Sequence, residues 1–236
     1  FNQLTTLPDS IEKLDGLTYL ELSENQLTEL TPSVASLERL TELYLNRNKL
    51  TSLPQGIWEL ESLFALYLSD NELREVPSVP WDLPSLRRLD IGRNRLTQLP
   101  FGIGHLTNLQ DLRVNRNQLG MIPPEIGNLT NLQHLDFARN QLASVPREIG
   151  NLTNLENLWL TSNRLTSIPI EIGNLTKLKT LNLPHNHLSD LPLGLGRLPD
   201  VKVLDVSHNL LVALPTELES LKDCGILIFS DNPLAS

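Results

Sequence analysis

The sequence contains one cysteine, Cys224, among its 236 residues. An internal disulfide framework needs paired cysteines, so it is excluded. The sequence also lacks any run of about 18 consecutive apolar residues, the length that a membrane-spanning helix requires. No signal peptide is recognisable at the start. These absences predict a chain without internal disulfides and without association with a membrane.

The sequence also lacks net positive charge, since its formal net charge is −9 and its pI is about 5.0. Nucleic-acid binding rests largely on Lys and Arg contacts to phosphates, so no nucleic-acid partner is expected. The charge is uneven along the chain. Glutamates make the beginning acidic, and arginines make the middle basic: Glu21, Glu24, Glu29, Glu38 and Glu42, then Arg87, Arg88, Arg93, Arg95, Arg113, Arg116 and Arg139. The net charge of the whole chain therefore does not reveal its separate acidic and basic regions.

One residue type recurs at a fixed interval of 23 positions, without insertion or deletion. The asparagines in this series are Asn2, Asn25, Asn48, Asn71, Asn94, Asn117, Asn140, Asn163, Asn186, Asn209 and Asn232. A fixed period of this size predicts a solenoid, in which each repeat packs on its neighbours. The unbroken register over about ten repeats predicts one domain, residues 1–236.

Each repeat reads LxxLxLxxNxLxxLPxxIxxLxx, as in the repeat that begins at Leu40. Leu43 and Leu45 alternate as the inward side chains of a short strand would. We expect Asn48 to be buried and to join the backbones of neighbouring turns, because an amide supplies both donors and acceptors. The segment from Leu53 and Pro54 onward predicts a short helical or 3₁₀ turn with proline at its first position.

Two repeats depart from this pattern. In one, Thr31-Pro32 moves the proline by one position. In the other, the segment 76–81 places Pro80 where isoleucine is expected. We predict an irregular arch there, with Trp81 filling the gap.

Across its whole length the pattern resembles the leucine-rich-repeat family. The LPxxIxxL half resembles intracellular Ras-group, bacterial and Roco-protein repeats, whereas one turn, residues 119–124, resembles the plant extracellular form. The resemblance implies an α/β solenoid, a horseshoe whose concave parallel β-sheet binds other proteins, with no catalytic activity and no cofactor. Extracellular members usually cap their ends with disulfides, so the single cysteine predicts a cytoplasmic protein. No polar cap is recognisable at either end, which predicts a fragment of a larger protein.

The period turns distance along the sequence into distance in space, so residues 23 apart should be neighbours on adjacent strands. All three tyrosines, Tyr19, Tyr44 and Tyr67, fall at outward strand positions, as does Trp159. Tyrosine and tryptophan concentrate at interface hot spots, although aromatic residues also suit strands in general. We expect Tyr44 and Tyr67 to be adjacent, with Trp159 four strands further on.

Charged residues alternate on three successive strands. The pairs are Arg88 with Asp90, Asp111 with Arg113, and His134 with Asp136. Opposite charges on neighbouring strands stabilise a sheet by roughly 0.2–1 kcal/mol per pair. The pattern predicts a checkerboard that either neutralises itself or also contacts a partner.

Arginine occupies the same position of three successive turns, at Arg93, Arg116 and Arg139. Stacked like charges are unfavourable unless carboxylates such as Asp90 and Asp136, or an acidic partner surface, face them. The alternative interpretation is a solvated edge.

Candidate catalytic and metal-binding residues are few. His185 and His208 should be neighbours, with Asp231 one turn beyond, which is compatible with zinc but more typical of surface histidines. Cys224 replaces a core leucine and needs no reactive role. No metal site and no catalytic residue are predicted.

We therefore predict a non-enzymatic recognition module that is monomeric as an isolated domain. The alternatives are a regulatory or substrate-recognition segment of a larger signalling enzyme (of kinase, Roco GTPase or ubiquitin-ligase type), and a structural, self-associating array. The predicted contacts with a protein partner are Tyr19, Tyr44, Tyr67, Arg88, Arg93, Arg113, Arg116, His134, Arg139 and Trp159.

Overall fold

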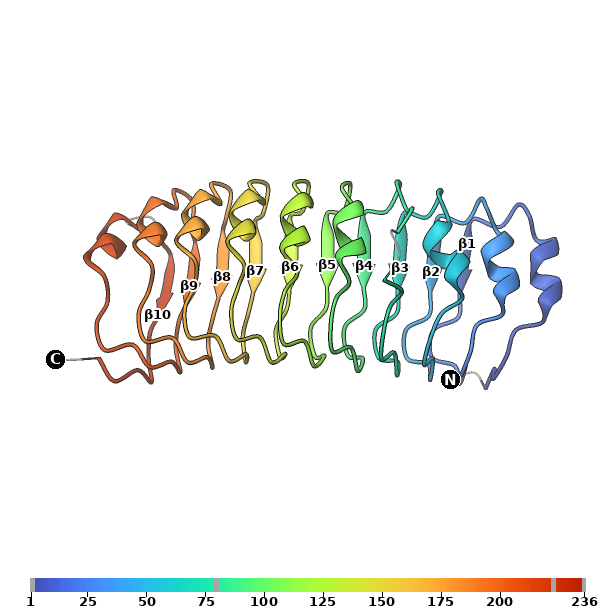
Figure 1. The fold of residues 1–236 in the computed structure, drawn as a ribbon, viewed down its shortest axis with the longest axis horizontal. Helices are drawn as coiled ribbons and strands as arrows, with labels where there is room; N and C mark the ends of the chain where they lie inside the picture. The colour runs from blue at the N-terminus through green and yellow to red at the C-terminus, as the bar shows by residue number, and fades with distance from the viewer. Residues whose placement is uncertain (1–2, 79–80, 222–223, 235–236) are drawn as a thin grey trace.

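The computed structural model describes residues 3–78, 81–221 and 224–234. The chain forms an elongated coil, in which each turn contributes one short strand to a common sheet (Figure 1). The strands are β1 (Tyr19–Glu21), β2 (Glu42–Tyr44), β3 (Ala65–Tyr67), β4 (Arg88–Asp90), β5 (Asp111–Arg113), β6 (His134–Asp136), β7 (Asn157–Trp159), β8 (Thr180–Asn182), β9 (Val203–Asp205) and β10 (Ile226–Ile228). The predicted solenoid fold is confirmed.

The ten strands pair in parallel and in the order of the sequence, β1 to β10. Every pairing has the register that the period predicts. Tyr44, for example, is opposite Tyr67, and Asp90 is opposite Arg113. Residues 23 apart are therefore spatial neighbours, and the outward side chains form continuous columns along what we call the concave face.

The other half of each turn contains a 3₁₀ helix, and these helices cover the side of the coil opposite the outward strand side chains (Figure 1). In the described part of the chain they are η1 (Asp9–Lys13), η2 (Pro32–Ser36), η3 (Gln55–Glu59), η4 (Phe101–His105), η5 (Pro124–Asn128), η6 (Arg147–Asn151), η7 (Ile170–Asn174), η8 (Leu193–Arg197) and η9 (Thr216–Ser220). None of the described helices is long and apolar enough to cross a membrane.

The prediction that proline occupies the first helical position is wrong for most turns. Pro54 is the N-cap of η3, with an extended backbone, and its carbonyl accepts the N–H of Ile57 at 3.1 Å. Proline fits here because its fixed φ suits the extended cap and its carbonyl remains free to accept. Pro32 does lie at the first position, and Thr31 caps η2 by accepting the N–H of Ser33.

The repeated asparagines hold successive turns together, as predicted. Asn117 is 8% exposed. Its amide nitrogen donates to the carbonyls of Val114 in its own turn and Ile91 in the turn before, both at 3.0 Å. Its carbonyl oxygen accepts the N–H of Leu96 at 2.9 Å. The side chain thus satisfies backbone groups that the strand leaves unpaired as it enters the interior.

From Asn25 to Asn232, the residue just before each of these asparagines adopts a left-handed conformation, which the sequence did not signal. Their φ angles lie between 49° and 58°, and none of the residues is glycine. They are Glu24, Arg47, Asp70, Arg93, Arg116, Arg139, Ser162, His185, His208 and Asp231. Such a conformation is unfavourable for a side chain larger than hydrogen, so the inward asparagine imposes it where the chain turns.

The arch between β3 and β4 is irregular, as predicted, since its described residues form no helix. Trp81 fills the space. It is 1% exposed, stacks on Trp58 with ring centroids 4.4 Å apart, and donates its indole N–H to the carbonyl of Pro77 at 3.0 Å. Val79 and Pro80, on which the prediction also rested, lie outside the described residues.

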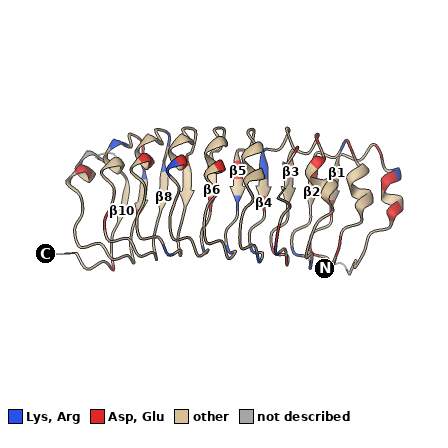
Figure 2. Ribbon diagram, in the orientation of Figure 1, with Lys and Arg blue, Asp and Glu red and all other residues tan. Residues whose placement is uncertain are grey.

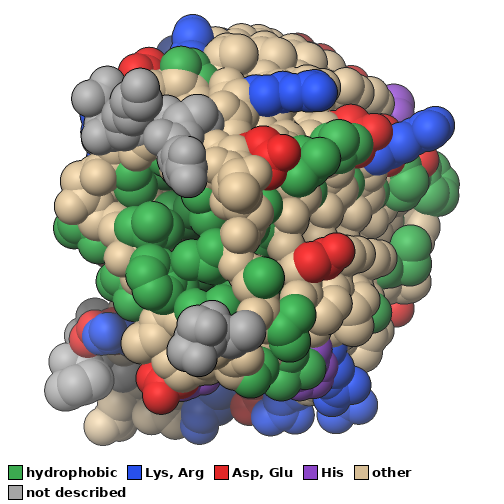
Figure 3. Space-filling model, turned by 90° about the vertical axis from the view of Figure 1, so that its left-hand side faces the viewer, with side chains coloured by type: hydrophobic (Ala, Val, Ile, Leu, Met, Phe, Trp, Pro, Cys, Tyr) green, Lys and Arg blue, Asp and Glu red, His purple; other side chains and the backbone are tan. Residues whose placement is uncertain are grey.

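The last described turn leaves apolar side chains open. Ile226 and Ile228 point outward and are 51% and 38% exposed, as predicted. The inward residues Leu227 and Phe229 are also 38% and 39% exposed, because no turn among the described residues packs on that side of them. Figure 3 shows hydrophobic side chains gathered on this end of the coil. Cys224, predicted to be a core residue, is only partly buried for the same reason.

Candidate functional site

Three tyrosines form a continuous ladder across β1, β2 and β3 on the concave face. The ring centroids of Tyr19 and Tyr44 are 5.2 Å apart, and those of Tyr44 and Tyr67 are 4.7 Å apart and stacked. Tyr19 is half exposed, and Tyr44 and Tyr67 are partly exposed. The predicted adjacency is confirmed. Ala65, on the same strand as Tyr67, is fully buried.

Carboxylates hold the tyrosine ladder in place. The Tyr44 hydroxyl donates to Oε2 of Glu42 at 2.6 Å, and the Tyr19 hydroxyl reaches Oε2 of Glu21 at 3.5 Å. The hydrogen bond to Glu42 raises the pKa of Tyr44. The phenol therefore stays neutral, and its ring is held between those of Tyr19 and Tyr67 while remaining partly exposed.

A hollow of about 610 Å³ opens further along the same face, across β4 to β7. We call it the central hollow. Four of the residues predicted to bind a partner line it, together with carboxylates and small polar side chains. Its lining is Ser69, Asp70, Asp90, Arg93, Asp111, Arg113, Asn115, His134, Asp136, Ala138, Asn157 and Trp159.

Arg113 stands at the centre of this hollow. Its Nη2 and Nε donate to Asp111 at 2.9 and 3.2 Å, which makes a two-pronged ion pair within one strand. Its column neighbours Asp90 and Asp136 instead accept backbone N–H groups, from Gly92 at 3.0 Å and Ala138 at 2.8 Å. One guanidinium therefore lies among three carboxylates.

Asp90 and Asp136 have raised pKa values. Burial is the main cause for both, and the backbone N–H donors and Arg113 offset it only in part. Burial acts this way because it penalises the charged form of a carboxyl group. The central hollow therefore carries negative charge that its two arginines, Arg93 and Arg113, neutralise only in part.

Asp90→Asn is expected to raise the free energy of unfolding at pH 7, because the amide removes a partly buried charge and can still accept the N–H of Gly92. The pKa of Asp90 is higher in the folded chain than in the unfolded one. The parent protein therefore gains stability as pH falls through the folded value. The advantage of the variant should accordingly shrink toward about pH 4, near the unfolded value.

Urea unfolding of both proteins at pH 7 and near pH 4 measures this difference. Asp111→Asn serves as the control, because it removes the ion pair with Arg113. It should leave stability unchanged or lower it by up to about 1 kcal/mol. A stability difference between Asp90→Asn and the parent that does not vary with pH would contradict the explanation.

The predicted checkerboard forms only in part. Asp111 and Arg113 pair along their strand, as predicted, but the described part of the chain shows no ion pair across strands among these six residues. Among the described residues Arg88 makes no ion pair; its guanidinium lies 5.4 Å from the ring centroid of Phe64 instead. Nδ1 of His134 accepts the Asn157 amide at 2.9 Å, so His134 does not pair with Asp136. Long flexible side chains choose among several nearby partners, and spacing alone does not decide between them.

The arginine row follows the strand ends along one edge of the coil, where Figure 2 shows basic and acidic residues together. Arg93 pairs with Asp70 of the preceding turn at 3.5 Å, not with Asp90 as predicted. Arg116 and Arg139 are exposed, and no ion pair is found for them within the described ranges. Along this edge, one guanidinium group therefore has an ion-pair partner, and two have none among the described residues.

The histidines are adjacent, as predicted. The rings of His185 and His208 stack with centroids 4.2 Å apart, and Nε2 of His208 lies 3.3 Å from Asp231. Over residues 3–78, 81–221 and 224–234 the structure holds no group of three or more His, Cys, Asp or Glu residues arranged for a metal ion.

The predicted binding residues thus fall into three parts of one face. Tyr19, Tyr44 and Tyr67 form the ladder. Arg93, Arg113, His134 and Trp159 line the central hollow, where the rings of His134 and Trp159 are 6.4 Å apart. Arg88 lies between these two regions, and Arg116 and Arg139 lie on the edge. The hollow itself was not predicted, although the closely spaced Asp90, Asp111 and Asp136 could have indicated it.

Family models support the fold independently. A model described as leucine-rich repeat region matches residues 77–183. A leucine-rich-repeat model matches 25–73 and 38–96, and another matches 177–198. No curated protein sequence matches the chain.

Solved structures of related architecture superpose over nearly the whole chain. A leucine-rich-repeat protein from Leptospira interrogans is 37% identical with a TM-score of 0.95, covering 99% of this chain and 60% of that one. A TDR receptor is 32% identical with a TM-score of 0.90, covering 97% and 41%. The functional domain of InlJ from Listeria monocytogenes is 23% identical with a TM-score of 0.82, covering 98% and 52%, and is similar in fold alone.

This chain therefore spans about three fifths of the Leptospira protein and less of the receptor. The buried leucine pairs, the asparagine that joins consecutive turns and the matching family models all agree. The chain is a leucine-rich-repeat protein.

Proposed function

We propose that this chain is a non-enzymatic recognition module that binds a protein partner on its concave face. The observation that carries the proposal is the tyrosine ladder, whose neighbouring ring centroids are 4.7 and 5.2 Å apart while the rings remain partly exposed. Fixed aromatic side chains give a partner a large contact area at little cost in side-chain entropy. Likeness to a receptor of the same fold supports a role in recognition.

The charged groups beside the ladder favour one orientation of the bound partner. Arg113 neutralises the carboxylates of the central hollow only in part, so the hollow favours a basic side chain of the partner. The edge has Arg116 and Arg139 without ion pairs within the described ranges, so it favours an acidic part of the partner's surface. A partner with both charges would bind in one orientation, and raising the salt concentration would slow its association.

The double substitution Tyr44→Ala with Tyr67→Ala is expected to weaken binding by about 30-fold or more, since anchor residues of this kind contribute about 2 kcal/mol or more. The partner is first selected by affinity from the native cell lysate and identified, and binding is then measured by calorimetric titration of the purified pair. Both tyrosines lie on the surface of the core, so circular dichroism should be unchanged.

The matched control is Phe101→Ala with Met121→Ala. These residues are 56% and 59% exposed and lie away from the strands. The control pair should bind as tightly as the parent. Unchanged affinity in the tyrosine variant, or an equal loss in the control, would contradict binding through the tyrosine ladder.

A further inference from the structure

The helix-bearing side of the coil has one break in its regular packing. At the position of Trp58, later turns carry glycine at 23-residue intervals, as in Gly104 and Gly127. A Cβ on Gly104 would lie 2.9 Å from Cβ of Glu125, so neighbouring turns are too close there for a side chain. Two successive turns carry Trp58 and Trp81 instead, where the next arch has no described helix. The tryptophans therefore occupy space that regular turns do not have.

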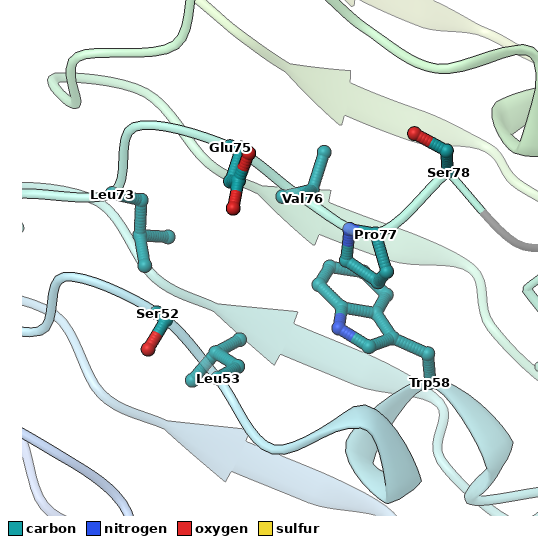
Figure 4. A pocket seen from close by; sticks show the side chains of 8 residues that line it. All are labelled: Ser52, Leu53, Trp58, Leu73, Glu75, Val76, Pro77 and Ser78. Atoms are coloured by element: carbon teal, nitrogen blue, oxygen red, sulfur yellow. The ribbon is translucent and has the colours of Figure 1, made fainter.

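The tryptophans do not use all of that space. A hollow of about 270 Å³ remains beside them, lined by Ser52, Leu53, Trp58, Leu73, Glu75, Val76, Pro77 and Ser78. Figure 4 shows the indole nitrogen of Trp58 facing the side on which Leu53 and Glu75 lie. We call this space the arch pocket. Its size is just below the range of about 300–1,000 Å³ that is usual for small-molecule sites.

One buried donor at this pocket has no acceptor among the described residues. Trp58 is 1% exposed, and its indole N–H makes no hydrogen bond within the described part of the chain. The matching group of Trp81 donates to the carbonyl of Pro77, so the environment does supply acceptors for one ring of the pair. Buried polar groups are nearly always paired, because leaving one unpaired is costly. An unpaired donor beside a hollow therefore indicates that a bound ligand supplies the acceptor.

The other residues that line the pocket indicate which kind of ligand would supply that acceptor. Leu53, Leu73, Val76 and Pro77 provide an apolar surface. Glu75 is the one charged residue of the lining; it is exposed, and the described parts of the chain place no cation within ion-pair distance of it. A carboxylate at the pocket disfavours anions and favours a cation.

We propose that the arch pocket binds the N-terminal residue of a peptide when its side chain is apolar. The carbonyl oxygen accepts the indole N–H of Trp58, the side chain packs on Leu53 and Val76, and the α-ammonium group faces Glu75. Solvent does not reach the indole nitrogen, so the side chains between it and the hollow must shift slightly when the acceptor enters. The site is separate from the concave face, and its occupation does not depend on the tyrosine ladder.

The test uses L-leucinamide, which has the apolar side chain, the carbonyl and the ammonium group of such a residue. The full chain contains three tryptophans, Trp58, Trp81 and Trp159, so a ¹H–¹⁵N spectrum reports three indole N–H groups. Leucinamide should move the Trp58 signal downfield and saturably, with a dissociation constant on the order of millimolar for so small a ligand. The Trp159 signal should not move.

Three variants separate the contacts. Trp58→Phe keeps a ring but removes the donor, and should weaken binding about tenfold. Glu75→Gln should weaken leucinamide binding by up to about fivefold and leave binding of N-acetyl-leucinamide, which lacks the ammonium group, unchanged. Ser52→Leu places a side chain in the hollow from an exposed position and should abolish binding without removing any core residue.

The proposal is overturned if leucinamide causes no saturable shift at tens of millimolar, if the shift survives Ser52→Leu, or if N-acetyl-leucinamide binds as tightly as leucinamide. Should Trp58→Phe fail to fold, the Ser52→Leu and Glu75→Gln comparisons decide the question alone.

Discussion

Asn117→Ala is expected to lower the free energy of unfolding by about 3 kcal/mol or more. The substitution removes the side-chain acceptor of the buried Leu96 N–H and one of two asparagine donors to each of the Ile91 and Val114 carbonyls, which keep the donors of Asn94 and Asn140. The N–H left unpaired costs about 1–3 kcal/mol, and each of the two other lost hydrogen bonds about 0.5–1.5 kcal/mol. Because these groups belong to consecutive turns, the loss acts on the contact between turns. Urea unfolding followed by circular dichroism measures it.

Two controls distinguish this explanation from a general effect of substitution. Gln118→Ala changes the adjacent exposed residue and should alter stability by less than about 0.5 kcal/mol. Asn117→Asp keeps an acceptor for the Leu96 N–H but turns a carboxylate toward two carbonyls, so it should be at least as destabilising as alanine. A mild effect of Asn117→Asp would show that the amide donor contributes little.

Gly173→Ala should destabilise the chain by about 2 kcal/mol through crowding rather than through a lost contact. A Cβ at Gly173 would lie 2.4 Å from the backbone oxygen of Gly194 in the next turn. That oxygen belongs to η8 and cannot rotate away as a side chain would. Chemical unfolding gives the size of the effect, and hydrogen exchange should show the loosening concentrated at η7 and η8.

The matched control is Gly120→Ala. No atom lies within 4 Å of the position that its Cβ would occupy, and its φ is not positive. This variant should be neutral or up to about 1 kcal/mol more stable, because alanine restricts the unfolded chain. Equal destabilisation by both substitutions would mean that close packing between η7 and η8 is not the cause.

The fold follows from the sequence because one period determines every neighbour. The spacing of Asn94, Asn117 and Asn140 predicts the strand register and the burial of the amides, and both are confirmed. The adjacency of Tyr44 and Tyr67 is confirmed for the same reason. The 23-residue period does not predict the local backbone conformation. Nothing in Arg116 signals its left-handed conformation, which the turn imposes on a residue that does not favour it.

For the candidate site, the sequence predicts the column in which each residue lies but not all of the contacts that its side chain makes. The period places Arg113 between Asp90 and Asp136, yet the guanidinium pairs with Asp111 on its own strand. A choice among several carboxylates within reach depends on rotamers and burial, which spacing does not specify. The arch pocket was missed for another reason. A tryptophan at a glycine position is visible in the sequence, but the unpaired state of its donor is not.

The central claim is that the partner lies across the concave face, over the ladder and the central hollow. Hydrogen–deuterium exchange of the chain with and without its identified partner tests this most directly. We expect slower exchange in the strands from β1 (Tyr19–Glu21) to β7 (Asn157–Trp159), with η5 and η6 on the other side of the coil unchanged. Protection of those helices with unchanged exchange in the strands would contradict it.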